Sequence, residues 1–219
     1  MHKATFTIQD EHRSLAAVLH GLLHVADGIA SHGTPPDFRL LDAMIAYIEG
    51  FPEACHHPKE DAYLFRLLRE RAPQAAATLD DVEAQHREGH GRLAQLKQAL
   101  ADFRTCVETR AAQPDGRAGD DQRWSDIGCQ VQAVAFLDSA RSYAEFHWKH
   151  MRIEEDVVLH LAEKVFSAAD WAELEAAFAS HRDPLRGIGT DGTDFRALFT
   201  RIVTLTPAPI GLGPSRDAA

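Results

Sequence analysis

The stretch His147-Trp148-Lys149-His150-Met151-Arg152-Ile153-Glu154-Glu155-Asp156 decides the predicted fold, and Cys55-His56-His57-Pro58-Lys59-Glu60-Asp61 is its earlier counterpart. Both stretches place a glutamate four residues after a histidine. On an α-helix this separation is about one turn, so both side chains leave one face and can reach one object. Imidazole and carboxylate groups are both ligands of first-row metals. Two such pairs in one chain predict a metal centre inside a helical bundle.

The composition favours one domain with a sizeable core, because 45% of the 219 residues are hydrophobic. The formal net charge of −10 argues against binding to nucleic acid or to an anionic membrane surface. No stretch approaches ~18 consecutive apolar residues, so we expect no membrane span. The N-terminus lacks the apolar run of a signal peptide. Cys55, Cys106 and Cys129 are widely spaced and show no disulfide framework, so we expect reduced cysteines and a cytoplasmic protein.

Helical periodicity and turn residues divide the chain into four long helices and a short fifth one. We expect these helices at residues 7–32, 37–72, 75–110, 122–166 and 168–180, with Thr7 as the first N-terminal cap. Pro52 and Pro58 lie inside the second helix, where each removes a backbone donor and should kink or restart the helix. A polar loop is expected at residues 113–121.

The two halves of the chain resemble each other. The tripeptide Glu11-His12-Arg13 in the first helix matches Gln85-His86-Arg87 in the third, and each helix precedes one with His-x-x-x-Glu. The predicted fold is therefore all-α, an up-down four-helix bundle built from a duplicated helical hairpin. Residues 1–186 would form the bundle and its short closing helix. The Gly/Pro-rich residues 187–219 would form an irregular C-terminal tail.

The direction in which each histidine faces distinguishes candidate ligands from surface residues. At about 100° per residue, His12 lies roughly 40° from the centre of the apolar stripe of its helix and should face the core. His20 and His24 lie roughly 120° and 160° away and should face solvent. In the fourth helix, His150 and Glu154 share the face of the apolar residues, so both are candidates.

The second and third helices offer further pairs. His56 and Glu60 share a face with the apolar residues that follow them. His57 and Asp61 have the same spacing but are rotated about 100° toward the flank, which favours the first pair, although Pro58 leaves the register open. The third helix adds two histidines four residues apart along the edge of its stripe. The candidates for one interior site are thus His12, His56, Glu60, His86, His90, His150 and Glu154.

Seven protein ligands are too many for one transition-metal ion. They suit two adjacent ions with bridging carboxylates and an open coordination position. Iron is the favoured metal, because imidazole and carboxylate both suit it, whereas manganese usually has more oxygen ligands. Zinc usually takes three or four protein ligands. Ferritin-like di-iron bundles use Glu-x-x-His motifs and four carboxylates, so the histidine-rich set here is different.

These motifs resemble the hemerythrin-like, or HHE cation-binding, family over roughly residues 7–186. The resemblance implies two iron ions joined by an oxo or hydroxo bridge, with Glu60 and Glu154 as shared ligands. It places His12 and His56 on the iron with the open position, and the other three histidines, His86, His90 and His150, on the second iron. Oxygen carriers of this family have an aspartate five residues after the last histidine. Here Glu154 is at four and Glu155 at five, so Glu155 competes as the bridge.

Three functions are compatible with such a centre. The first is binding of O2 or NO for sensing, storage or delivery. The second is an enzyme that acts on peroxide or NO, for which His147 or Tyr143 could supply a proton. The third is an interaction module in which the metal mainly supports folding. No appended DNA-binding or sensory domain is visible, and the sequence predicts no particular oligomeric state.

Overall fold

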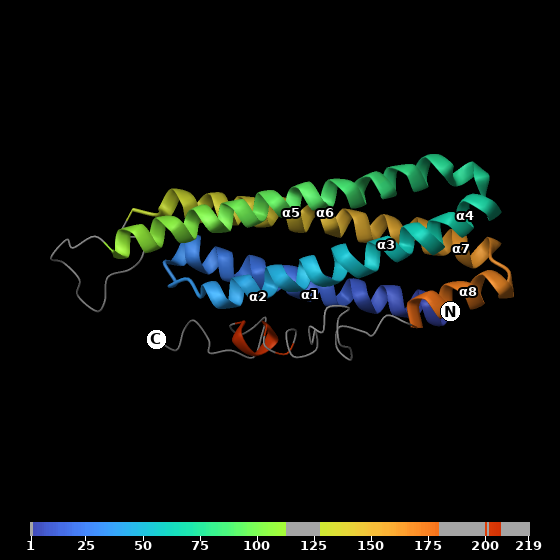
Figure 1. Cartoon of the computed structure of the whole chain (residues 1–219), viewed down its shortest axis with the longest axis horizontal. Coiled ribbons are helices and arrows are strands. Elements are labelled where there is room, and N and C mark those ends of the chain that lie inside the picture. The colour runs from blue at the N-terminus through green and yellow to red at the C-terminus, as the bar shows by residue number, and fades with distance from the viewer. Residues whose placement is uncertain (1, 113–127, 180–199, 201, 207–219) are drawn as a thin grey trace.

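The computed structural model describes residues 2–112, 128–179, 200 and 202–206, and the regular elements in these ranges are all helices. Four long helical rods lie side by side, and consecutive rods run in opposite directions (Figure 1). A shorter helix lies alongside the rods at one end of this bundle, beside the N-terminus. The predicted all-α bundle with a short fifth helix is confirmed.

The rods differ in their regularity. The first rod is α1, Lys3–His32, and the third is α5, Ala76–Ala111. The second rod is divided into α2 (Phe38–Ile48), η1 (Glu49–His56), α3 (His57–Lys59), η2 (Glu60–Phe65) and α4 (Arg66–Arg71). The fourth is divided into α6 (Gln130–Ile153), η5 (Glu154–Leu159) and α7 (His160–Val165). The 3-10 turn η3 (Pro73–Ala75) joins α4 to α5, and α8 (Ala168–Ala179) is the closing helix.

The helix ends follow from capping contacts. Asp37 caps α2 by accepting hydrogen bonds from the N–H groups of Arg39 and Leu40. Thr7, however, is not the first cap, since α1 begins four residues earlier and the Thr7 hydroxyl donates to the carbonyl oxygen of Lys3. Glu175 of α8 accepts a hydrogen bond from the Lys3 N–H at 3.0 Å, so a partner distant in sequence supports the start of α1.

The interruption predicted near Pro52 and Pro58 is confirmed. The backbone changes from α-helix to π-helix in η1, which contains Pro52, and returns to α-helix one residue before Pro58. Two further π-helical segments follow, η2 in the second rod and η5 in the fourth. The η5 segment contains no proline, so prolines do not explain every change of helix type.

Two apolar clusters fill the bundle. The long apolar cluster occupies the half near the α5–α6 connection, and its fully buried members include Leu19, Leu22, Met44, Phe103 and Phe136. The end cluster lies where α8 closes the bundle, and its members include Ile8, Phe65, Leu79, Trp171 and Phe178. Between these two clusters along each rod lie the buried histidines and glutamates. The fold thus encloses a polar layer between two apolar ones.

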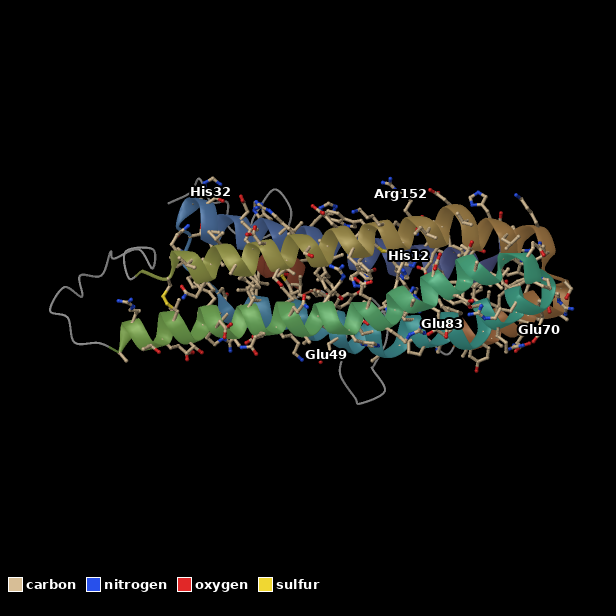
Figure 2. All side chains as sticks on the ribbon, turned by 90° about the horizontal axis from the view of Figure 1, so that it is seen from above. His12, His32, Glu49, Glu70, Glu83 and Arg152 are labelled. Carbon is tan, nitrogen blue, oxygen red and sulfur yellow. A yellow bond between two sulfur atoms is a disulfide. The ribbon has the colours of Figure 1, made fainter. Side chains whose placement is uncertain are left out.

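The expectation that all cysteines are reduced is wrong for two of them. Cys106 in α5 and Cys129 just before α6 form a disulfide, with Cα atoms 5.9 Å apart (Figure 2). The antiparallel packing of α5 against α6 brings together residues that are 23 positions apart in the sequence. Sequence spacing alone does not show this proximity. The cytoplasmic location remains a prediction, and the cysteines no longer support it because two of them are oxidised.

Several regions predicted from sequence have a different outcome. The loop expected at 113–121 lies outside the described residues, as does much of the tail expected at 187–219. Within that tail, residues 202–205 are helical and Ile202 is buried, so the prediction of an irregular tail is wrong there.

By length and composition, α1 could cross a membrane, but 61% of its apolar window is buried in the bundle, as in a core helix of a globular protein.

Candidate metal centre

Each π-helical segment in the described rods contains a candidate ligand at one of its ends. His56 is the last residue of η1, Glu60 is the first of η2, and Glu154 is the first of η5. A π-helical turn holds more residues than an α-helical one, and such turns are frequent at functional sites. The change of helix type therefore sets which neighbouring side chains face the bundle interior.

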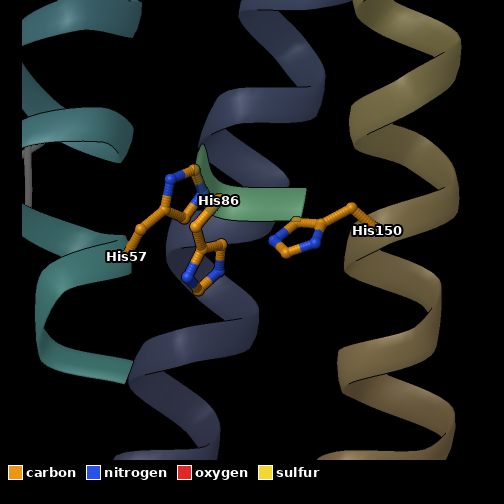
Figure 3. Close-up of side chains that lie close together, drawn as sticks. All are labelled: His57, His86 and His150. Atoms are coloured by element: carbon orange, nitrogen blue, oxygen red, sulfur yellow. The ribbon is translucent and has the colours of Figure 1, made fainter. Parts of the chain in front are cut away.

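Five histidines and two glutamates from all four rods form one buried group, which we call the inner cluster. Their exposed fractions are between 0% and 4%. His57, His86 and His150 converge from three different rods (Figure 3). The inner cluster consists of His12, His56, His57, Glu60, His86, His150 and Glu154.

The inner cluster divides into two subsites. One combines His12 and His56 with both glutamates, and all four residues offer ligand atoms within 4.8 Å of one another. In the other, the ligand atoms of His86, His150 and both glutamates also lie within 4.8 Å of one another. The ligand atoms of His57, His86 and His150 meet the same limit. We call these the two-histidine subsite and the three-histidine subsite. The two glutamates belong to both.

The two carboxylates are oriented to span the subsites. Oε1 of Glu60 lies 3.2 Å from Nε2 of His56, while its Oε2 lies 3.6 Å from Nε2 of His86. Oε2 of Glu154 lies 3.2 Å from Nε2 of His12 and 3.3 Å from Nε2 of His150. Nε2 atoms of His12 and His56 are 3.1 Å apart. Nitrogen ligands lie about 2.1 Å from a zinc-sized ion, so two at a right angle on one ion are about 3 Å apart.

The opposite ring nitrogen of each histidine faces an acceptor outside the cluster. Such an acceptor holds the proton on Nδ1 and leaves the lone pair of Nε2 for a metal. The Nδ1–oxygen distances are 2.9 Å for His12 with Glu155, 2.6 Å for His56 with Glu11, 2.8 Å for His86 with Asp61, 3.1 Å for His150 with Gln85, and 3.4 Å for His57 with Glu53. The last contact is the longest and is not a hydrogen bond.

Several polar atoms at the centre have no hydrogen-bond partner among the described residues. They are both carboxylate oxygens of Glu60, Oε2 of Glu154 and Nε2 of His150. Leaving buried polar atoms unsatisfied is costly, and buried charges are normally paired or bound to metals. Two cations in the subsites would satisfy all four atoms. The donor set therefore fits a pair of metal ions.

A comparison with family models assigns residues 4–162 to the hemerythrin HHE cation binding domain, a range that includes every residue of the inner cluster. The chain belongs to this family. The resemblance predicted from the His-x-x-x-Glu motifs is thereby confirmed. No curated protein and no solved structure gives a significant match.

The inner cluster of this HHE chain holds protons when no metal is bound. Burial lowers the pKa of His12, but its contacts with the carboxylates of Glu154 and Glu155 outweigh burial and raise the pKa to about 9. Burial also lowers the pKa of His86, but its contacts with Asp61 and Glu154 outweigh burial and raise the pKa to about 10. Burial lowers the pKa of His150 to about 3. Metal ligation requires neutral imidazoles, so metal binding must displace the protons on His12 and His86.

Six of the seven predicted ligands lie in the inner cluster, and His90 does not. Its side chain is 61% exposed, and its Nδ1 lies 3.3 Å from Oε2 of Glu53. Because α5 is a regular α-helix, His90 is rotated about 40° from His86, which carries it out of the interior. His57 occupies the place expected for His90. The prediction that His57 lies on the flank used the angles of a regular α-helix. The π-helical segments η1 and η2 lie on either side of the short α3, so these angles do not apply to His57.

The choice between Glu154 and Glu155 follows from their positions. Glu154 is fully buried between both subsites, whereas Glu155 is partly exposed and contacts His12 at Nδ1 from outside. The geometry favours Glu154 as the shared ligand, with Glu155 as the group that orients His12.

The residues that orient the histidines were not among the predicted site residues, although the sequence contains a signal for them. In each of the matching dipeptides Glu11-His12 and Gln85-His86, both residues take part in the site. The histidine enters the cluster, and the preceding residue contacts Nδ1 of a histidine on the following rod, His56 or His150. The internal duplication therefore extends to the groups that orient the ligands.

Proposed function

We propose that this chain binds two iron ions in the inner cluster and reversibly binds O2 or NO at the two-histidine subsite. The unequal number of histidines carries this proposal. With the two glutamates shared, the subsite of His12 and His56 has one protein ligand fewer than the other subsite. Two ferrous ions would supply an open coordination position where a diatomic molecule can bind.

A pocket on the protein surface supports access on this side. It has a volume of about 460 Å³, and its lining includes His12, Trp148, Met151 and Glu155. Since His12 belongs to the two-histidine subsite, a small molecule in this pocket is next to the subsite with fewer ligands. Glu155, which contacts Nδ1 of His12, lies at the same surface and fixes the orientation of that ring.

Apolar neighbours support reversible binding. Phe51 and Phe178 lie 6.5 Å and 6.3 Å from the ring of His56, and Phe65 lies 5.5 Å from the ring of His86, measured between ring centroids. These side chains limit water at the centre, and the apolar shell of a metal site influences its redox potential. Imidazole and carboxylate donors together suit iron, which supports the choice of metal.

Peroxide chemistry is a second candidate, supported by a buried hydroxyl. Tyr143 donates a hydrogen bond to Oε1 of Glu53 at 3.0 Å, and the other oxygen of Glu53 lies 3.4 Å from His57. Burial and the negative charge of Glu53 raise the pKa of Tyr143 well above 10.0, so the phenol keeps its proton at neutral pH. A protonated phenol that contacts His57 through Glu53 would give the three-histidine subsite a nearby proton donor, as general acid catalysis requires.

Anaerobic loading with Fe²⁺ tests the two candidates. We expect two irons per chain and an absorption band that appears with O2 and disappears when O2 is removed. Irreversible oxidation with rapid turnover of added peroxide would favour the enzyme. His56→Ala should lose iron, whereas His32→Ala, with an exposed side chain at the far end of α1, is the control. A chain that retains no iron, or a His56→Ala variant that retains both ions, contradicts the proposal.

A further inference from the structure

Glu53 is a buried carboxylate outside the inner cluster, and imidazoles surround it. Its side chain lies in η1 and is 4% exposed. Oε2 lies 3.3 Å from Nδ1 of His90 and 3.4 Å from Nδ1 of His57. Oε1 lies 3.7 Å from Nε2 of His147 and accepts the hydrogen bond of Tyr143. One carboxylate thus faces three imidazole nitrogens.

Much of this polar group is unsatisfied. Both ring nitrogens of His147, which is 1% exposed, make no hydrogen bond with the part of the chain that the structure describes. The same holds for Oε2 of Glu53 and Nδ1 of His57. Since buried polar atoms normally have partners, these atoms point to a ligand that can bind oxygen and nitrogen donors together.

We propose that Glu53, His90 and His147 form a third cation site, which we call the outer cation site, for a divalent first-row metal. The carboxylate–nitrogen distances to these two histidines are 3.3 and 3.7 Å. Two ligands about 2.1 Å from a tetrahedral ion are roughly 3.4 Å apart. His90 and His147 approach different oxygens of Glu53, so the exposed His90 side chain would have to turn inward to share one ion with the other two groups. A carboxylate with imidazoles is also a donor set typical of these metals.

The surroundings leave this site accessible from solvent. A pocket of about 720 Å³ is lined by Glu53 and His90, and its rim includes the ion pair of Glu49 with Lys97 at 2.7 Å. Gly89 leaves room for the buried carboxylate, because a Cβ atom there would lie 3.2 Å from Oε1 of Glu53. A cation in the pocket would therefore meet His90 first and Glu53 next.

The outer cation site also adjoins the inner cluster through His57. Nδ1 of His57 faces Glu53, and its ring stacks on His86 with centroids 4.3 Å apart. Metal-binding side chains thus follow one another from the pocket to the three-histidine subsite. We assign the outer site a role in loading this subsite, a role that rests on the proposed metal centre.

Titration of the metal-free full chain with Co²⁺ tests the proposal. We expect three Co²⁺ per wild-type chain by metal analysis after equilibrium dialysis, and two in His90→Ala and in Glu53→Gln. Loading of the inner cluster, followed by stopped-flow Co²⁺ absorption, should slow at least tenfold in both variants. His90 is exposed, so its replacement leaves the core intact. His32→Ala, with a similarly exposed side chain, is the control and should match wild type.

Each outcome decides one part of the proposal. A wild-type chain that binds only two ions, or a His90→Ala variant that binds three, overturns the outer cation site. Loss of the third ion without slower loading retains the site and overturns the loading role. A single Co²⁺ that is lost in His90→Ala, with none in the inner cluster, supports the outer site and contradicts the proposed function instead.

Discussion

The long apolar cluster and the inner cluster are built on the same four rods in opposite ways. Around the long apolar cluster, α1, α5 and α6 are regular helices, and side chains such as Leu22 and Phe136 are completely buried. Around the inner cluster, the second and fourth rods change to π-helix, and buried carboxylates lack hydrogen-bond partners in the described ranges. Apolar burial stabilises the bundle. The difference suggests that one region supplies stability and the other supplies chemistry.

The strongest test of this separation removes a shared ligand. Glu154→Gln should abolish binding of the metal pair, because Glu154 contributes to both subsites. We expect a loss of affinity larger than the roughly 10- to 100-fold caused by removing a partner outside the ligand shell. Metal analysis after dialysis against a metal buffer measures the effect. Retention of two ions at wild-type affinity would contradict the assignment of the inner cluster.

A change in the long apolar cluster should have the opposite effect. Leu22→Ala removes a completely buried side chain and should reduce the free energy of unfolding by about 3 kcal/mol. The folded variant should still bind two ions. Urea unfolding gives the first quantity, and metal analysis at low urea gives the second. If metal affinity fell in proportion to stability, the two regions would not be separable.

The fold followed largely from local sequence patterns. Apolar residues at helical spacing, Gly33 with φ of 66° after α1 and Asp37 before α2 are local signals, and the structure places helix boundaries at both. The direction of the His12 side chain could also be predicted from the sequence, because α1 is a regular helix from Lys3 to His32. Thr7 was misread because the contact of Glu175 with Lys3 is tertiary.

The finer parts of the site depend on features without a local signal. His57 enters the cluster because π-helical segments flank it, and helical angles computed for a regular α-helix assign it to the wrong face. Glu53 was overlooked because its importance comes from His90 and His147 on two other rods. The Cys106–Cys129 disulfide likewise requires the packing of two rods to be known.

The groups that orient the histidines should have an intermediate effect. Glu11→Ala removes the acceptor 2.6 Å from Nδ1 of His56 and leaves its Nε2 side unchanged. We expect metal affinity to fall about 10- to 100-fold, as for other carboxylates that hold a ligating histidine. Competition with a coloured chelator measures this change. Since Gln85 occupies the equivalent position for His150, Gln85→Ala should weaken affinity in the same direction. An effect of Glu11→Ala on stability alone would show that Glu11 does not act through His56.

The last expected effect is the pH dependence of the metal-free protein. The pKa of His12 is about 9 and that of His86 about 10, both raised from 6.5. Between pH 7 and pH 10 the unfolded chain has neutral histidines, while the folded chain gradually loses these two protons. The stability that protonation provides is therefore lost as pH rises through this window. The urea midpoint of the metal-free protein should fall from pH 7 to pH 9.5, and His86→Gln should reduce the fall. The metal-loaded protein should not show this fall from His12 and His86, because metal binding has already displaced their protons. An equal fall in both forms would place its cause outside the inner cluster.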